Sequence, residues 1–179
     1  MREETKARLE VLMARYEKRL ADVRKRQELT HKRRDAFIGL FERLVEQTIR
    51  PAMEDVGAVL RSRGHEYEIA TTKGYTDVDG GLHNTQITMR LYPVGIDRSL
   101  FVSTSTPYVA FASDWLDARV TVQESTAMPV GNSKAPGNRG KSGKGAAYSI
   151  GQLTPAAVER EIVDVLAGIF GREWVRQPR

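Results

Sequence analysis

Residues 3–35 read EETKARLEVLMARYEKRLADVRKRQELTHKRRD. The stretch contains no glycine or proline and is rich in glutamate, lysine, arginine, alanine and leucine, which are strong helix formers. Glu28 and Lys32 have the spacing of an acid-to-base pair, which stabilises an exposed helix by ~0.3 kcal/mol. The stretch therefore predicts one long, basic helix at the start of the chain.

Apolar side chains recur along this helix at alternating spacings of four and three residues. We call the first five of them the seam: Leu9, Met13, Tyr16, Leu20 and Val23. The same phase continues through three polar residues and then returns to apolar ones, in the order Gln27, Thr30, Arg34, Phe37, Phe41 and Leu44. This heptad pattern is typical of a coiled coil, whose apolar side chains need a partner helix to cover them.

The length of the pattern favours a partner outside the chain's own body. From Leu9 to Leu44 a helix spans ~53 Å, whereas a body of about 140 residues has a radius of gyration near ~14 Å. We therefore expect the seam to bind another copy of the chain or a different protein. Two alternatives remain open: the helix packs its stripe on its own domain, or it turns near residues 27–36 and buries residues 9–23 against residues 37–60.

The rest of the chain predicts an α+β domain. Pro51 interrupts the helical pattern, and an apolar stripe over residues 52–60 ends at Gly64. Period-two alternation then predicts an antiparallel meander of four to six strands with a C-terminal helix packed on the sheet. The expected strands cover residues 66–70, 84–92, 100–105, 108–113, 119–124 and 148–153, and the final helix follows Thr154 and Pro155.

The sequence accordingly divides into a helix at residues 1–36 for oligomerisation or partner binding and an α+β domain at residues 37–179. Within the second part, residues 129–147 read PVGNSKAPGNRGKSGKGAA and predict a flexible, basic, glycine-rich loop. Residues 1–36 carry twelve Lys/Arg against seven Asp/Glu, and residues 131–147 carry four cations and no acid. Candidate anion-binding residues are Arg24, Lys25, Arg26, Lys32, Arg33, Arg34, Lys134, Arg139, Lys141 and Lys144.

Composition excludes several classes of protein. The chain has 179 residues, 40% of them hydrophobic, and no cysteine, which excludes disulfides and thiolate metal sites and fits a reducing compartment. The first residues lack the apolar core of a signal peptide, and no apolar run is long enough to cross a membrane. We therefore expect a cytoplasmic protein with no membrane partner.

Enzymatic motifs are weak in this sequence. Gly140-Lys141-Ser142 lacks the glycine that a phosphate-binding loop needs at position 135, which is Ala. Asp77, Asp79 and His83 lie close together, but aspartates of this kind are typical of turns. No Gly-x-Ser-x-Gly motif is present. We therefore predict no catalytic residue, no metal site and no cofactor.

The predicted sheet also carries residues suited to a nucleic-acid platform, namely Tyr92, Tyr108, Phe111, Arg90 and Arg119. Since the sheet must also carry the core, most of these aromatic residues are expected to serve packing.

The leading hypothesis is a non-enzymatic interaction or assembly protein that forms homo-oligomers or joins a larger complex through its N-terminal helix. The alternative is a nucleic-acid-associated protein that uses the basic helix and loop, and a metal-dependent enzyme ranks third.

Overall fold

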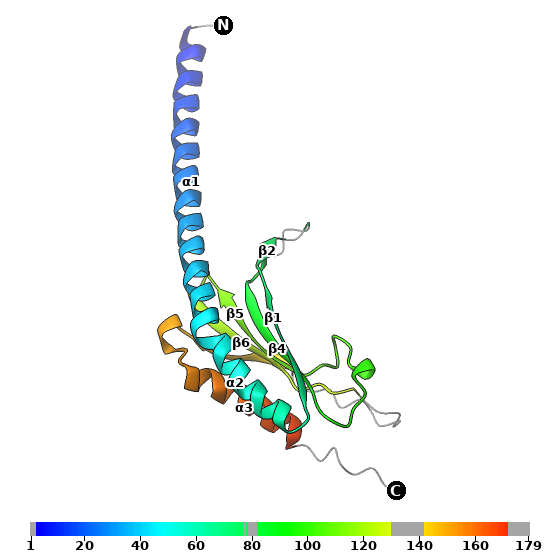
Figure 1. Cartoon of the computed structure of the whole chain (residues 1–179). Coiled ribbons are helices and arrows are strands. Elements are labelled where there is room, and N and C mark those ends of the chain that lie inside the picture. The colour runs from blue at the N-terminus through cyan, green and yellow to red at the C-terminus, as the bar shows by residue number, and fades with distance from the viewer. Residues whose placement is uncertain (1–2, 77, 79–81, 130–141, 172–179) are drawn as a thin grey trace. The chain divides into compact units, whose positions relative to one another are not determined.

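A computed structural model describes residues 3–76, 78, 82–129 and 142–171 of the chain (Figure 1). Two compact units are present, residues 1–37 and residues 38–179. The architecture is α+β, as predicted: a long N-terminal helix, a five-stranded antiparallel sheet and a C-terminal helix.

The N-terminal helix consists of three consecutive segments. Helix α1 spans Glu3–Leu44, a π-helical turn η1 follows at Val45–Ile49, and helix α2 spans Arg50–Ser62. The expected pair on its surface is present, with Lys32 Nζ 2.8 Å from a carboxylate oxygen of Glu28. No turn interrupts residues 27–36, so the intrachain hairpin considered from the sequence is wrong.

Pro51 explains the change of helical type. It lies in the first turn of α2, where its missing N–H is tolerated, and its ring would clash with the carbonyl four residues earlier in a regular helix. The preceding turn is widened instead, so that the N–H of Arg50 donates to the carbonyl of Val45, five residues back. The helical course therefore continues past the proline into α2 rather than ending there.

The main sheet is an antiparallel meander in the order β1-β4-β5-β6-β7. Its strands are β1 (Glu66–Thr72), β4 (Gln86–Tyr92), β5 (Tyr108–Asp114), β6 (Arg119–Ser125) and β7 (Ser142–Tyr148). Each strand pairs with its neighbour along the chain. Two short strands, β2 (Tyr75–Thr76) and β3 (Leu82–His83), pair with each other in the stretch of chain that connects β1 to β4, and Figure 1 labels β2.

One face of the sheet carries the core. Helix α3 spans Pro155–Phe170, begins at the N-cap Thr154, and contacts α2, η1, β5 and β6. Figure 1 shows α2 and α3 beside each other at the sheet. The fully buried side chains come from all of these elements and include Phe41, Ile49, Met53, Ile87, Met89, Val109, Phe111, Val120, Val122, Val158 and Ile162. The C-terminal helix therefore packs on the sheet as predicted.

The expected strand at residues 100–105 is wrong. Residues 100–105 form no strand: a 3₁₀ turn, η2, spans Arg98–Leu100, and turns follow it. Side chains hold this segment by bonding to nearby backbone, since Asp97 accepts from the N–H of Ser99 and the Thr106 hydroxyl donates to the carbonyl of Val102. Such local bonds compete with a strand ladder.

The predicted loop at residues 129–147 and the predicted strand at residues 148–153 also need correction. Residues 142–147 belong to β7, and a 3₁₀ turn, η3, occupies Ile150–Gln152 with a capping box from Ser149 and Gln152. Strand β7 contains two glycines and two alanines, which have low strand propensity, and it forms because its backbone pairs with β6. Residues 130–141 of the predicted loop lie outside the described residues.

Candidate partner-binding surface

The seam lies on α1 and faces solvent. Leu9, Met13, Tyr16 and Val23 have exposed fractions between 48% and 61%, and Leu20 is half-buried. A monomeric chain buries large apolar side chains where it can, and single exposed ones need no explanation. Five at heptad spacing on one helix form a continuous apolar surface instead, and this is the property that a partner helix requires.

Leu12 extends this surface, although the seam defined from the sequence omits it. It is exposed and lies three residues after Leu9 and four before Tyr16, which is the spacing of neighbours on one helical face. Val11 and Leu29 are exposed on the opposite side of the helix. The signal for Leu12 was present in the sequence as an i, i+3, i+4 pattern and is missed when only the strict heptad is followed.

The second half of the heptad pattern has a different environment. Phe41, Val45, Ile49 and Met53 are buried and belong to the core of the second unit. The apolar stripe from Phe41 onward is therefore part of the globular core, whereas the seam at residues 9–23 is exposed.

Most candidate anion-binding residues on α1 are exposed. These are Arg24, Lys25, Arg26, Lys32 and Arg33, whereas Arg34 is half-buried. Lys144 lies in β7, and its side chain is outside the described part. The other loop candidates, Lys134, Arg139 and Lys141, also lie outside the described residues. Successive residues of an α-helix are rotated by about 100° around its axis. The exposed cations at residues 24, 25 and 26 therefore point in different directions around the helix and do not line one face.

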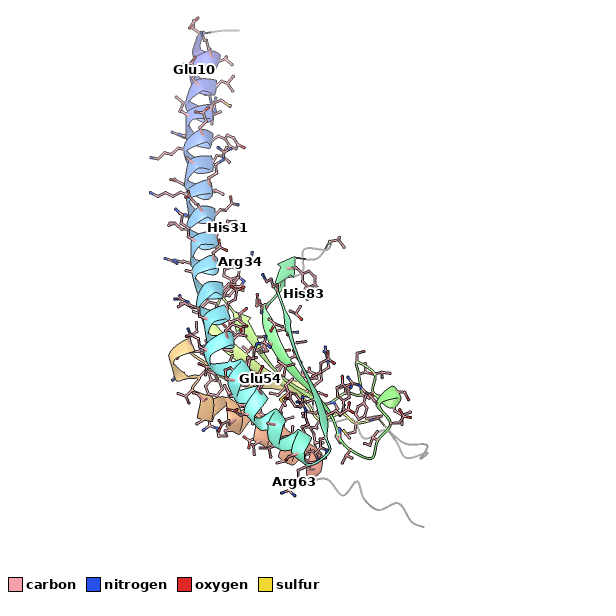
Figure 2. The ribbon with its side chains drawn as sticks, in the orientation of Figure 1. Glu10, His31, Arg34, Glu54, Arg63 and His83 are labelled. Carbon is pink, nitrogen blue, oxygen red and sulfur yellow. The ribbon has the colours of Figure 1, made fainter. Side chains whose placement is uncertain are left out.

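The histidines have separate environments, and Figure 2 labels His31 and His83. His31 is exposed on α1, whereas His65 follows α2 and accepts a hydrogen bond at Nδ1 from the N–H of Val94, at 3.0 Å. His83 on β3 stacks on the ring of Tyr75 with centroids 4.3 Å apart. Asp77 and Asp79, which the sequence placed near His83, lie outside the described residues. Within the described part of the chain, no group of three or more His, Cys, Asp or Glu residues could hold a metal ion.

The aromatic residues considered as a nucleic-acid platform lie on opposite faces of the sheet. Phe111 is buried in the core, whereas the register places Tyr108 beside Arg90 on the other face. Arg90 pairs with Glu68 at 3.7 Å, and the hydroxyl of Tyr92 donates to the same carboxylate at 3.1 Å. The five residues therefore do not form one platform, and Arg90 is already paired with an acid.

Tyr92 belongs to a polar network on the sheet surface. The guanidinium of Arg98 lies 4.4 Å from its ring centroid and 2.6 Å from a carboxylate oxygen of Glu66. Partial burial raises the pKa of Tyr92 above its usual value of 10.0, and the hydrogen bond to Glu68 raises it further. The network pairs acids with bases at the surface, which indicates a structural role.

A groove of ≈ 280 Å³ was not predicted. It is lined by Glu42, Val45, Glu46, Thr71, Lys73 and Thr85. Arg50 lies beside it, 3.5 Å from Glu46, and donates to the hydroxyl of Thr71 at 2.9 Å. The lining residues of the groove include no histidine. It arises because folding brings the π-helical turn beside the β1–β4 hairpin, a proximity that local sequence patterns do not report.

Comparisons with protein families, with curated proteins and with solved structures give no match for this chain. No helix in the described residues is long and apolar enough to cross a membrane.

Proposed function

We propose that this protein is a non-enzymatic assembly protein whose N-terminal helix binds a partner helix through the seam. The observation that carries the proposal is the exposed apolar surface formed by the seam residues and Leu12. Because water contact with apolar groups is unfavourable, covering this surface releases free energy. The second unit would then be the part that the assembly presents to other molecules.

The spacing of the seam favours a helix as the partner. Alternate intervals of three and four residues allow each apolar side chain to insert between four residues of a facing helix. Full burial of a large apolar side chain contributes about 1.5–3 kcal/mol, so a side chain that starts half exposed contributes about 1 kcal/mol. Six such side chains on each helix can offset the loss of translational and rotational freedom on association.

The cytoplasm is the compartment that we propose for this assembly, because a chain without cysteine needs no oxidising environment.

Light scattering of the intact chain tests the proposal. The expected mass of the wild type is at least twice the 20.1 kDa of one chain if the partner is a second copy. Leu20→Asp should return it to the monomer, because a carboxylate in the seam cannot be buried without a large desolvation cost. The matched control is Val11→Asp, which places the same charge on the opposite, exposed side of α1 and should leave the mass unchanged.

A result in which the wild type, Leu20→Asp and Val11→Asp all scatter as monomers would contradict self-association. A partner of different sequence would then be sought with the wild-type helix as bait and Leu20→Asp as the negative control. Equal binding of a candidate partner to both baits would overturn the assembly function of the seam.

Nucleic-acid binding is the second candidate function, and the exposure of five cations between residues 24 and 33 favours it. Binding through phosphates releases counterions, so the affinity should fall steeply from low to moderate salt. Absence of binding to duplex or single-stranded nucleic acid at low salt would exclude this function.

A further inference from the structure

We infer that the partner of the N-terminal helix is a second copy of this chain and that the two helices lie antiparallel. This inference rests on the proposed function and adds the identity and direction of the partner. It comes from charged residues beside the seam, all of which are on α1. Figure 2 shows two of them, Glu10 and His31, on this helix.

Two rows of residues flank the seam at intervals of seven. The first flank, which follows Leu9 and its heptad equivalents, consists of Glu3, Glu10, Glu17, Arg24 and His31. The second flank, which precedes Met13 and its heptad equivalents, consists of Thr5, Leu12, Arg19, Arg26 and Arg33. All ten are exposed. Residues at these positions contact the partner helix beside the apolar layer and determine the choice and orientation of the partner.

A parallel pair would place like charges together. In that arrangement the second flank of one helix faces the first flank of the other, five residues further along. Arg19 would face Arg24 of the second copy, and this contact occurs twice by symmetry. Glu10 and Glu17 would face Thr5 and Leu12, so no acid would meet a base. The flanks therefore disfavour a parallel pair of identical helices.

An antiparallel pair places opposite charges together. Each flank then faces the same flank of the partner. If Tyr16 lies opposite Leu20 of the second copy, Glu10 meets Arg24 twice. Like charges meet once each in the same register, where Glu17 and Arg19 each face the same residue of the second copy. The antiparallel pair therefore balances attraction and repulsion between its flanks, whereas the parallel pair has repulsion alone, and it has the symmetry of a twofold dimer.

The flank charges alone do not fix the register. Sliding one helix by a heptad would place Glu10 opposite Glu17 of the second copy, twice, but also Glu3 opposite Arg24, twice, so repulsion and attraction balance. The register with Tyr16 opposite Leu20 sets Met13 opposite Val23 and Leu9 opposite Gln27, and it pairs residues 3–33 of both copies. That overlap lies within the first compact unit.

The basic stretch at residues 24–36 supports the same direction. It carries six Lys/Arg against two Asp/Glu. Parallel helices would hold the two stretches side by side, at separations near the Debye length of about 8–10 Å, where repulsion is only partly screened. Antiparallel helices hold them at opposite ends of the overlap, tens of ångströms apart, where salt screens them. The second copy then presents its more balanced N-terminal half to each basic stretch.

Charge reversal at Arg24 separates the two directions. In the antiparallel dimer, Arg24→Glu faces Glu10 of the second copy, and the dissociation constant should rise about tenfold at low salt. In a parallel dimer the new carboxylate would face Arg19, and the dimer would become tighter. The double variant Glu10→Arg with Arg24→Glu should restore the wild-type constant to within about threefold, because both contacts are exchanged.

Lys25→Glu is the matched control for this series. It makes the same change in charge at the next residue, on the exposed side of the helix away from the flanks, so sedimentation equilibrium should give a constant within about twofold of the wild type. A tighter dimer for Arg24→Glu, or a double variant as weak as the single one, would overturn the antiparallel inference.

The distance between spin labels on the two copies provides an independent test of the helix direction. Because the chain contains no cysteine, Lys32→Cys and Lys18→Cys each provide one spin-label site per chain. In the antiparallel dimer the labels at position 32 lie about 28 residues apart along the axis, or about 42 Å, whereas those at position 18 lie close together. In a parallel dimer both pairs would lie within about 20 Å, given helix axes about 10 Å apart.

The outcomes distinguish the inference from the function on which it rests. A long distance at position 32 with a short one at position 18 supports the antiparallel dimer. Short distances at both positions overturn the antiparallel direction and leave self-association through the seam intact. No dipolar coupling at either position, in a sample that scatters as a monomer, overturns self-association itself.

Discussion

Two stretches of the N-terminal helix share one apolar spacing but have different environments. At residues 9–23 the side chains face solvent, whereas at residues 41–60 the equivalent stripe is buried against the sheet and α3. The spacing of apolar residues thus shows that a helix face needs cover without showing what provides it. In the second stretch the chain's own strands provide it, and in the first we propose that another helix does.

The largest expected difference between the stretches concerns stability. Phe41 is fully buried, so Phe41→Ala should lower the free energy of unfolding by about 3–5 kcal/mol through lost burial and a cavity. Tyr16→Ala, on the same helix, should leave the unfolding of the second unit unchanged within about 0.5 kcal/mol and weaken association instead. Urea denaturation followed by tryptophan fluorescence at low protein concentration measures the free energy of unfolding of both variants.

Equal losses of stability in the two variants would contradict the distinction between a core stripe and a partner-binding seam.

Two helical glycines provide a second, smaller comparison. A Cβ on Gly57 would lie 2.3 Å from Cζ of Tyr67, whose ring is also 4.8 Å from the Arg61 guanidinium, whereas a Cβ on Gly39 would meet nothing within 4 Å. Gly57→Ala should therefore destabilise the fold by about 1–3 kcal/mol through overpacking. Gly39→Ala should stabilise it by about 0.5–1 kcal/mol, since alanine favours a helix.

Thermal unfolding of the two alanine variants checks this pair. A stabilised Gly57→Ala would show that the Tyr67 ring moves aside without cost and is not a close packing contact of α2.

The smallest expected effect is a loss of stability at high pH, and it comes from two tyrosines at the surface of the sheet, one of them bonded to α3. The hydrogen bond to Glu161 raises the pKa of Tyr148, and burial raises that of Tyr92, both from 10.0. The folded state then holds these protons more tightly than the unfolded state, so their contribution to stability is present below pH 10 and is lost as the pH rises through the folded-state pKa.

Urea midpoints measured from about pH 9 upward should therefore fall, and more steeply in the wild type than in the variant with Tyr92→Phe and Tyr148→Phe. Identical pH profiles for the two proteins would mean that neither hydroxyl has a raised pKa. Ultraviolet difference spectra provide an independent record of tyrosinate formation.

The sequence predicted the elements whose patterns are local. The long helix, four strands close to their observed bounds and the capped C-terminal helix follow from helix formers, alternation and the pair Thr154 and Pro155. Strand β7 was not expected because its glycines and alanines carry no alternation, and only pairing with β6 defines it. The π-helical turn before Pro51 depends on how the backbone relieves a clash, which composition does not record.

For the candidate site, the sequence supplied the seam residues, and their binding role stays a prediction. The seam was defined by spacing alone, and its exposure is consistent with a partner-binding role that remains a proposal. Leu12 was missed because the strict heptad is narrower than a real apolar face. The groove beside Glu42 and Lys73 joins segments far apart in the sequence, and the face of Phe111 depends on strand register, so neither was evident from local patterns.

Amide hydrogen exchange of residues 9–23 tests the central claim most directly. A solvated helix opens readily and exchanges fast, whereas a helix covered by a partner is protected by the free energy of association. We predict that protection of these residues rises with protein concentration in the wild type and in Val11→Asp, and is lost in Leu20→Asp. Fast exchange of residues 9–23 at every concentration, with the second unit fully protected, would contradict the account.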